Sequence, residues 1–180
     1  MGLERVERLE RTLVHKGVII DFYQDTIKVP NGNIVKWDFI SHKGAAAVVA
    51  VNKEGKLLMV RQYRNALDRE TIEIPAGALD SADEPTHIAA ARELEEETGY
   101  KAGKMELLMT LRTTVAFCNE KIDVYVATDL EPGKQHLDED EFINVEEYDI
   151  EELLEMVYDC KIQDSKTVAA LMAYKNKYGK

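Results

Sequence analysis

Short apolar runs separated by turn residues fill most of the first third of the chain, a pattern typical of β-strands. The predicted strands are 18–23, 26–29, 34–40, 45–51 and 57–63. Asn31 and Gly32 lie between two of these runs, and Asn-Gly is a strong hairpin dipeptide. We therefore expect a small antiparallel sheet near the N-terminus, followed by a more apolar pair of strands.

The rest of the chain mixes strand-like runs with segments of helical spacing. We predict strands at 105–111, 122–127 and 145–148, helices at 150–158 and 164–178, and an earlier helix that Gly99 ends in a left-handed cap. Strands with interspersed helices predict an α/β layered domain. We expect two parts: an N-terminal β appendage at 1–42 and a larger domain at 43–180.

The helix before Gly99 is densely acidic. At about 100° per residue, Glu93, Glu96 and Glu97 fall on one helix face, so three carboxylates converge there. The opposite, apolar face carries Ile88, Ala91 and Leu94. Carboxylates at this spacing repel one another, and a cation between them relieves the repulsion. Oxygen ligands favour Mg²⁺ or Mn²⁺, whereas an ordinary solvated acidic face is the alternative interpretation.

Charge narrows the classes of function. The 180 residues include 34 acidic and 23 basic ones, a formal net charge of −11. This charge repels nucleic acid and anionic membranes at long range, so neither is an expected partner. A small anionic substrate still fits, because divalent cations invert the local sign of an acidic site.

Two further observations bear on location. No apolar run approaches the roughly 20 residues needed to cross a bilayer, and the charged start at 1–8 does not look like a signal peptide. Two cysteines, Cys118 and Cys160, give no disulfide framework and fit a reducing compartment. We expect a cytoplasmic protein.

The stretch from Gly77 to Tyr100 resembles the signature of the Nudix hydrolases, G-x5-E-x7-R-E-U-x-E-E-x-G-U, where U is a bulky apolar residue. It departs once, because six residues rather than five separate Gly77 from Glu84, unless Asp83 takes the role of the first glutamate. The resemblance implies an α/β/α sandwich around a mixed sheet, with the signature loop and helix beside the substrate cleft.

Further segments resemble the ADP-ribose pyrophosphatase branch of that family: the N-terminal hairpin, Arg61–Arg64, Glu73–Gly77, Asp138–Phe142 and Lys161–Thr167. The resemblance implies Mg²⁺-dependent cleavage of a nucleoside diphosphate sugar, with ADP-ribose giving AMP and ribose 5-phosphate.

The same resemblance implies a role for individual residues. The metal ligands are the Ala76 carbonyl, Glu93 and Glu97, with Glu96 as a shared or second ligand that also belongs to the catalytic residues. Arg92 holds a neighbouring glutamate in place, and the general base is Glu139 or Glu141. The implied substrate contacts are Arg64, Glu73, Tyr23 and Phe117.

Members of this branch commonly dimerise through the N-terminal hairpin, which completes the partner's adenine pocket, so Phe22, Tyr23 or Trp37 is expected to stack there.

The segment 114–117 lacks the proline and glycine typical of enzymes selective for ADP-ribose. Two alternatives therefore stay open: another substrate, such as GDP-mannose, a dinucleoside polyphosphate or an oxidised nucleotide, or a catalytically silent nucleotide-binding module.

Overall fold

The computed structural model describes residues 4–139 and 141–179, which form two compact units. One unit comprises 1–44 and 112–120, and the other comprises 45–111 and 121–180. Segment 112–120 belongs with the N-terminal unit because it returns to that sheet, where the Ile40 amide donates to the Phe117 carbonyl at 2.7 Å. The predicted division at residue 42 did not anticipate this return.

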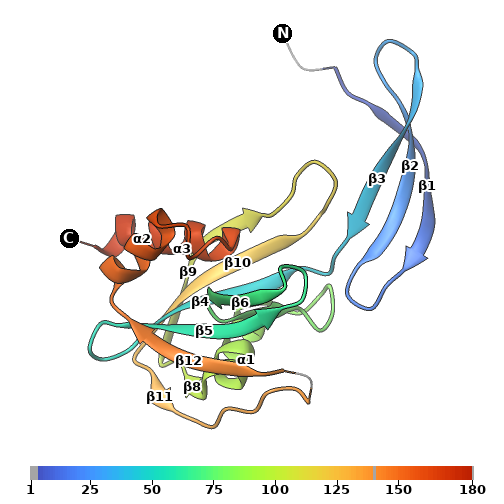
Figure 1. Cartoon of the computed structure of the whole chain (residues 1–180). Helices are drawn as coiled ribbons and strands as arrows, with labels where there is room; N and C mark the ends of the chain where they lie inside the picture. Colours follow the sequence, from blue (N-terminus) through green and yellow to red (C-terminus); the bar gives the residue numbers. More distant parts are fainter. Residues whose placement is uncertain (1–3, 140, 180) are drawn as a thin grey trace. The chain divides into compact units, whose positions relative to one another are not determined.

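The N-terminal unit is a three-stranded antiparallel sheet in the order β1 (Glu7–Lys16), β2 (Asp21–Lys28) and β3 (Ile34–Ser41) (Figure 1). Strand β1 was not predicted, and β2 runs unbroken through Asp25, where we expected an interruption. Asp25 is buried, and the Arg11 guanidinium of β1 donates two hydrogen bonds of 2.6 Å to its carboxylate. This pair allows a charged residue inside a small sheet.

The larger unit contains a mixed seven-stranded sheet. Its strands are β4 (Ala45–Val51), β5 (Leu57–Arg64), β6 (Arg69–Glu73), β7 (Ala76–Ala78), β9 (Lys104–Arg112), β10 (Lys121–Thr128) and β12 (Ile143–Tyr148). Strands β4 and β10 are parallel, whereas β5 pairs antiparallel with β4, β6 and β12, and β7 pairs antiparallel with β4. A short antiparallel pair joins β8 (Tyr100–Lys101) to β11 (Glu131–Pro132).

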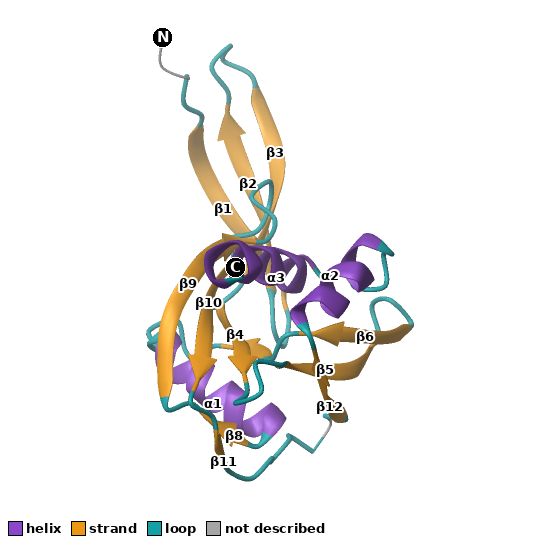
Figure 2. Ribbon diagram, turned by 90° about the vertical axis from the view of Figure 1, so that its left-hand side faces the viewer, coloured by secondary structure: helices purple, strands orange, loops and turns teal. Residues whose placement is uncertain are grey.

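Helices cover both faces of the larger sheet, which confirms the predicted α/β/α arrangement (Figure 2). Alternate residues of β4 belong to two separate cores. Ala47 and Val49 pack in the core that includes residues of α2 (Ile150–Tyr158) and α3 (Ser165–Tyr178). Val48 packs in the core that includes residues of α1 (Thr86–Thr98).

Helix α1 is fixed to the sheet at its first residue. The Thr86 hydroxyl donates to the buried Asp123 carboxylate of β10 at 2.9 Å and lies 2.7 Å from the Tyr125 hydroxyl. Its other end is the predicted left-handed cap, with Gly99 at φ 75°. Both ends of the acidic helix are therefore held in place. Within the described residues, no helix is both long and apolar enough to cross a membrane.

Candidate active site

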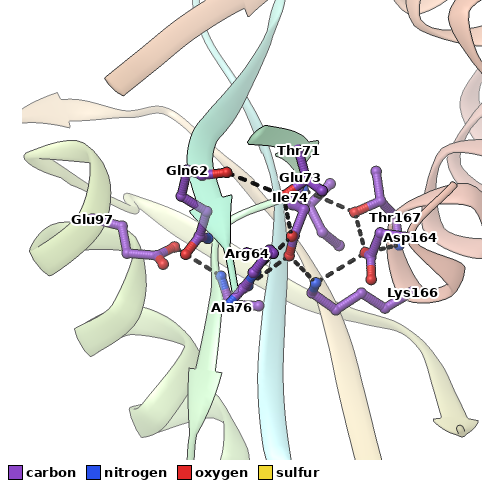
Figure 3. A network of polar contacts seen from close by, with 10 residues as sticks. All are labelled: Gln62, Arg64, Thr71, Glu73, Ile74, Ala76, Glu97, Asp164, Lys166 and Thr167. Carbon is purple, nitrogen blue, oxygen red and sulfur yellow. Dashed lines mark hydrogen bonds and ion pairs between the residues drawn. The ribbon is translucent and has the colours of Figure 1, made fainter. Parts of the chain in front are cut away.

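The larger sheet splits between β4 and β5, and the candidate site lies at the split. β4 pairs with β5 only at Ala50 and Val51, and then with β7, while β5 pairs with β6. The chain from β6 to β7 thus fills the gap, and the Pro75 carbonyl accepts a hydrogen bond from the Val48 amide at 2.8 Å. This geometry places Glu73 and Ala76 beside α1 and α3 (Figure 3).

The face of α1 that turns inward differs from the predicted one. Ile88 is 51% exposed and Ala91 is also exposed, so the expected apolar face was wrong at both positions. Glu93 and Glu97 are buried instead, next to Leu94. Both carboxylates are directed toward β7, where Glu97 accepts a hydrogen bond from the Ala76 amide and Glu93 lies against Gly77.

Glu97 is a buried carboxylate held by a backbone group. It accepts a hydrogen bond of 2.8 Å from the Ala76 amide of β7. Burial, helped by the charges of Glu93 and Glu141, raises the pKa of Glu97 to about 8 against the lowering effect of that amide. Without a cation, this carboxyl group favours its protonated form at neutral pH.

Glu93 lies against the backbone of Gly77. A Cβ atom added at Gly77 would stand 2.1 Å from the Glu93 carboxyl carbon, so only glycine leaves room for this approach. Burial raises the pKa of Glu93 to about 7, although Arg92 lowers it, and the charges of Glu96 and Glu141 add to the rise.

Arg92 contacts several of the signature carboxylates. Its Nη1 atom donates to Glu93 at 2.7 Å and to Glu96 at 2.9 Å, and its Nε atom lies 3.5 Å from Glu84. Glu84 also accepts the Asp80 amide at 2.7 Å, whereas Asp83 is exposed. Glu84 thus occupies the place of the first signature glutamate, and the extra residue is taken up by the exposed loop.

Glu73, another buried carboxylate, lies on the other side of Ala76 from Glu97 (Figure 3). Its carboxylate accepts two hydrogen bonds of 2.8 and 2.7 Å from Arg64. It also accepts one of 2.7 Å from Thr71 and one of 2.5 Å from Lys166. Burial raises the pKa of Glu73, but the hydrogen bonds of Arg64 and the charge of Lys166 outweigh it and lower the pKa to about 2. Glu73 is therefore ionised at any physiological pH.

The start of α3 contributes residues that our sequence analysis did not select individually. Asp164 accepts from Lys166 at 2.9 Å and caps the helix through the Thr167 amide at 3.0 Å. The Thr167 hydroxyl accepts the Ile74 amide at 3.1 Å, so α3 fixes the chain next to Glu73. Segment Lys161–Thr167 was noted only for its resemblance to relatives, since local periodicity does not reveal a contact 93 residues away.

The two candidate general bases lie on the loop before β12, next to Asp140, which is outside the described residues. Glu139 and Glu141 are both exposed. Glu141 is among the groups whose charge raises the pKa of both Glu93 and Glu97. Its carboxylate is therefore within electrostatic reach of the acidic face.

Tyr23 and Phe117, predicted to contact substrate, belong to the N-terminal unit. Phe117 lines a cavity of about 550 Å³ together with Phe22 and Trp37. Tyr23 follows Phe22 on β2 and so points to the opposite face of the strand, where its ring centroid is 6.1 Å from that of Phe39. The structure does not bring Tyr23 and Phe117 into one pocket.

The donor set of the acidic face suits a hard divalent cation. No three acidic, His or Cys side chains of the described residues form a ready metal cage. Glu93 and Glu97 are nevertheless buried carboxylates with raised pKa values, and Gly77 lets the Glu93 carboxylate lie directly against the backbone. A cation would replace the protons that these groups otherwise bind.

Comparison with known proteins identifies the family. The model of the NUDIX domain matches residues 41–171. The chain belongs to the Nudix family of hydrolases, whose members generally use divalent metals.

Individual relatives agree with this assignment. The chain is 41% identical over 160 residues to the ADP-ribose pyrophosphatase of Bacillus subtilis, covering 88% of this chain and 86% of that one. It is 40% identical, with the same shares covered, to the methanol dehydrogenase activator of Bacillus methanolicus. A crystal structure of an ADP compounds hydrolase matches with a TM-score of 0.86 at 20% identity, covering 98% of this chain and 95% of that one, which shows the shared fold.

Proposed function

We propose that this protein hydrolyses the diphosphate bond of a nucleoside diphosphate sugar, with ADP-ribose cleaved to AMP and ribose 5-phosphate. The observation that carries the proposal is the pair of buried carboxylates, Glu93 and Glu97, whose raised pKa values call for a cation. The ADP-ribose pyrophosphatase among the relatives supports the choice of substrate.

Glu93, Glu97 and the Ala76 carbonyl would hold Mg²⁺, with Mn²⁺ as a substitute and Glu96 as a shared ligand. Bound there, the metal supplies neutralisation of the diphosphate oxygens and lowers the pKa of a nearby water. Arg92 keeps Glu93 and Glu96 in the rotamers that its hydrogen bonds fix, and Arg64, held by Glu73, donates to a diphosphate oxygen.

In the reaction a water oxygen forms a bond to one phosphorus while the bridging P–O bond breaks, giving two phosphomonoesters. We assign the general base to Glu141 rather than Glu139, because its charge acts on both Glu93 and Glu97. Glu141 takes the proton of the attacking water and the bridging oxygen leaves as a phosphate oxygen.

We also propose a homodimer joined through the N-terminal sheet. Every residue of β1 except Arg11 is exposed, including Leu9 and Leu13. In that dimer Phe22, Trp37 and Phe117 would stack on the adenine, whereas Tyr23 packs against Phe39 on the opposite face of β2 and would not reach it. We expect the dimer in the cytoplasm, and the unpaired Cys118 and Cys160 are consistent with that compartment.

A substrate panel tests the function. The purified protein is incubated with Mg²⁺ and either ADP-ribose, GDP-mannose, a dinucleoside polyphosphate or an oxidised nucleotide, and both phosphorylated products are identified. Highest kcat/KM with ADP-ribose, with release of AMP and ribose 5-phosphate, supports the proposal. A different preferred substrate contradicts the assigned specificity. Binding without Mg²⁺-stimulated hydrolysis favours a regulatory module, a role suggested by the activator among the relatives.

A further inference from the structure

A cavity of about 430 Å³ opens beside the Arg64–Glu73 pair, between the β5–β6 hairpin and the segment that leads into α3. Its wall carries two carboxylates, Glu73 and Asp164, and four cationic side chains, Arg64, Arg69, Lys161 and Lys166. The chain as a whole has a formal charge of −11, so this cavity has the opposite sign to its surroundings.

Both carboxylates of the cavity are already bound by groups of the protein. Glu73, 3% exposed, accepts from Arg64 and Lys166, and Asp164 accepts from Lys166 and Thr167. They do not neutralise Arg69, whose Nη2 atom donates to the amide oxygen of Gln163 at 2.5 Å. The cavity therefore keeps an excess of positive charge.

Several donors remain for a ligand. The Arg64 fork bonds Glu73 through Nε and Nη2, which leaves the Nη1 edge of a side chain that is 42% exposed. Lys161 pairs with Asp159 at 3.0 Å, but both side chains are more than 60% exposed, so solvent weakens this pair. Arginine forks together with lysine ammonium groups match the tetrahedral oxygens of a phosphate.

The remaining walls indicate what is attached to that phosphate. They consist of Thr71, Gln163 and the aliphatic residues Ala66, Leu67 and Ile72. No aromatic side chain is found among the described residues that line the cavity. A nucleobase would have no ring to stack on, whereas hydroxyl groups of a sugar find an amide and a hydroxyl.

We propose that this cavity binds the phosphomonoester of a small sugar phosphate without any metal. The link to catalysis rests on the proposed function, which releases such a product. The cavity shares Arg64 and Glu73 with the proposed substrate contacts, so a sugar phosphate bound there competes with the substrate.

Ribose 5-phosphate binding to the full-length protein in EDTA tests the proposal by calorimetry. Without metal the acidic face of α1 offers no bound cation to a phosphate, so binding reports the cationic cavity. Free ribose and inorganic phosphate serve as probes for the two halves of the ligand. The double variant Arg69→Gln/Lys161→Gln removes two exposed charges from the cavity. The matched control Lys53→Gln/Lys104→Gln removes two exposed charges that do not line it.

We expect ribose 5-phosphate to bind, free ribose to fail, and the cavity variant to bind at least about tenfold more weakly while the control binds normally. Inhibition of hydrolysis by ribose 5-phosphate should weaken in parallel. Equal binding by the cavity variant and the wild type overturns the proposal, as does an absence of binding. Equally tight binding of inorganic phosphate overturns the sugar part. If the cavity variant still hydrolyses ADP-ribose, the proposed function stands even where the proposal of a sugar phosphate site fails.

Discussion

Glu73 and Glu97 are buried carboxylates on either side of Ala76, and they differ in whether cationic side chains bind them directly. Glu73 is neutralised by Arg64 and Lys166, and its pKa is lowered to about 2. Glu97 receives one backbone amide, and its pKa is raised to about 8. Side chains of the protein itself balance the negative charge of Glu73. The charge of Glu97 is instead balanced by a proton or by an added cation. The contrast separates a residue that holds Arg64 in place from one that the proposed function assigns to metal binding.

Replacing Glu97, the carboxylate with the raised pKa, should have the largest effect on activity. Glu97→Gln keeps the shape of the side chain but removes the charge that binds the metal, so we expect kcat/KM to fall roughly a thousandfold at low Mg²⁺. The control is Glu95→Gln on the same helix, where the lost partner is the exposed Lys101. Near-normal kcat of Glu97→Gln at low Mg²⁺ would refute the metal role.

The loop glutamates offer a matched pair for the general base. Glu141→Gln should lower kcat roughly a hundredfold with little change in KM, because water activated by metal still reacts slowly. Glu139→Gln should remain close to the wild type. Steady-state kinetics at saturating Mg²⁺ measure both variants, and the reverse order of effects would assign the base to Glu139.

Removing the ammonium group of Lys166 from beside Glu73 should have a moderate effect on activity. Lys166→Met leaves Glu73 with Arg64 and the neutral Thr71, so Arg64 is less well placed, and we expect KM to rise about tenfold. Lys166→Arg should restore part of the loss. An unfolding curve for each variant separates lost stability from lost positioning. If KM is unchanged in a folded Lys166→Met protein, Lys166 serves stability alone.

The pH dependence of stability should differ between the two sites. The raised pKa values of Glu93 and Glu97 mean that, in EDTA, their contribution is complete below about pH 4.5 and is lost as the pH rises through about 7 and 8. The lowered pKa of Glu73 has the opposite sign, with a contribution that is lost only as the pH falls toward about 2. We therefore expect Mg²⁺ to raise Tm by several degrees, roughly 5 °C, at pH 9 and by less at pH 6. Equal stabilisation by Mg²⁺ at both pH values would contradict the raised pKa values.

Local patterns predicted the interior of the fold well. The strand at 45–51 and the helix at 150–158 have the predicted bounds, because continuous apolar runs and helical spacing report burial directly. Strand β1 was missed because its charged, exposed residues show little apolar alternation. Its pairing with β2 instead depends on contacts such as Arg11 with Asp25, which lie 14 residues apart.

The candidate site was predictable in composition but not in orientation. The spacing of Glu93, Glu96 and Glu97 and the partnership with Arg92 follow from one helix. The burial of Glu93 and the exposure of Ile88 do not, because the packing of α1 against residues of distant strands, through Leu94 and its neighbours, decides which face turns inward. The contact of Lys166 with Glu73 joins residues 93 apart in sequence, a separation that periodicity cannot bridge.

The loop before α1 closes on itself, with the Glu84 carboxylate accepting the Asp80 amide while the residues between them are exposed. A chain built this way can gain or lose a residue at 81–83 without shifting the helix that follows. Searches that demand a fixed distance between the glycine and the first glutamate would therefore pass over related enzymes. Insertions engineered at this point should be tolerated better than at any position between Glu84 and Gly99.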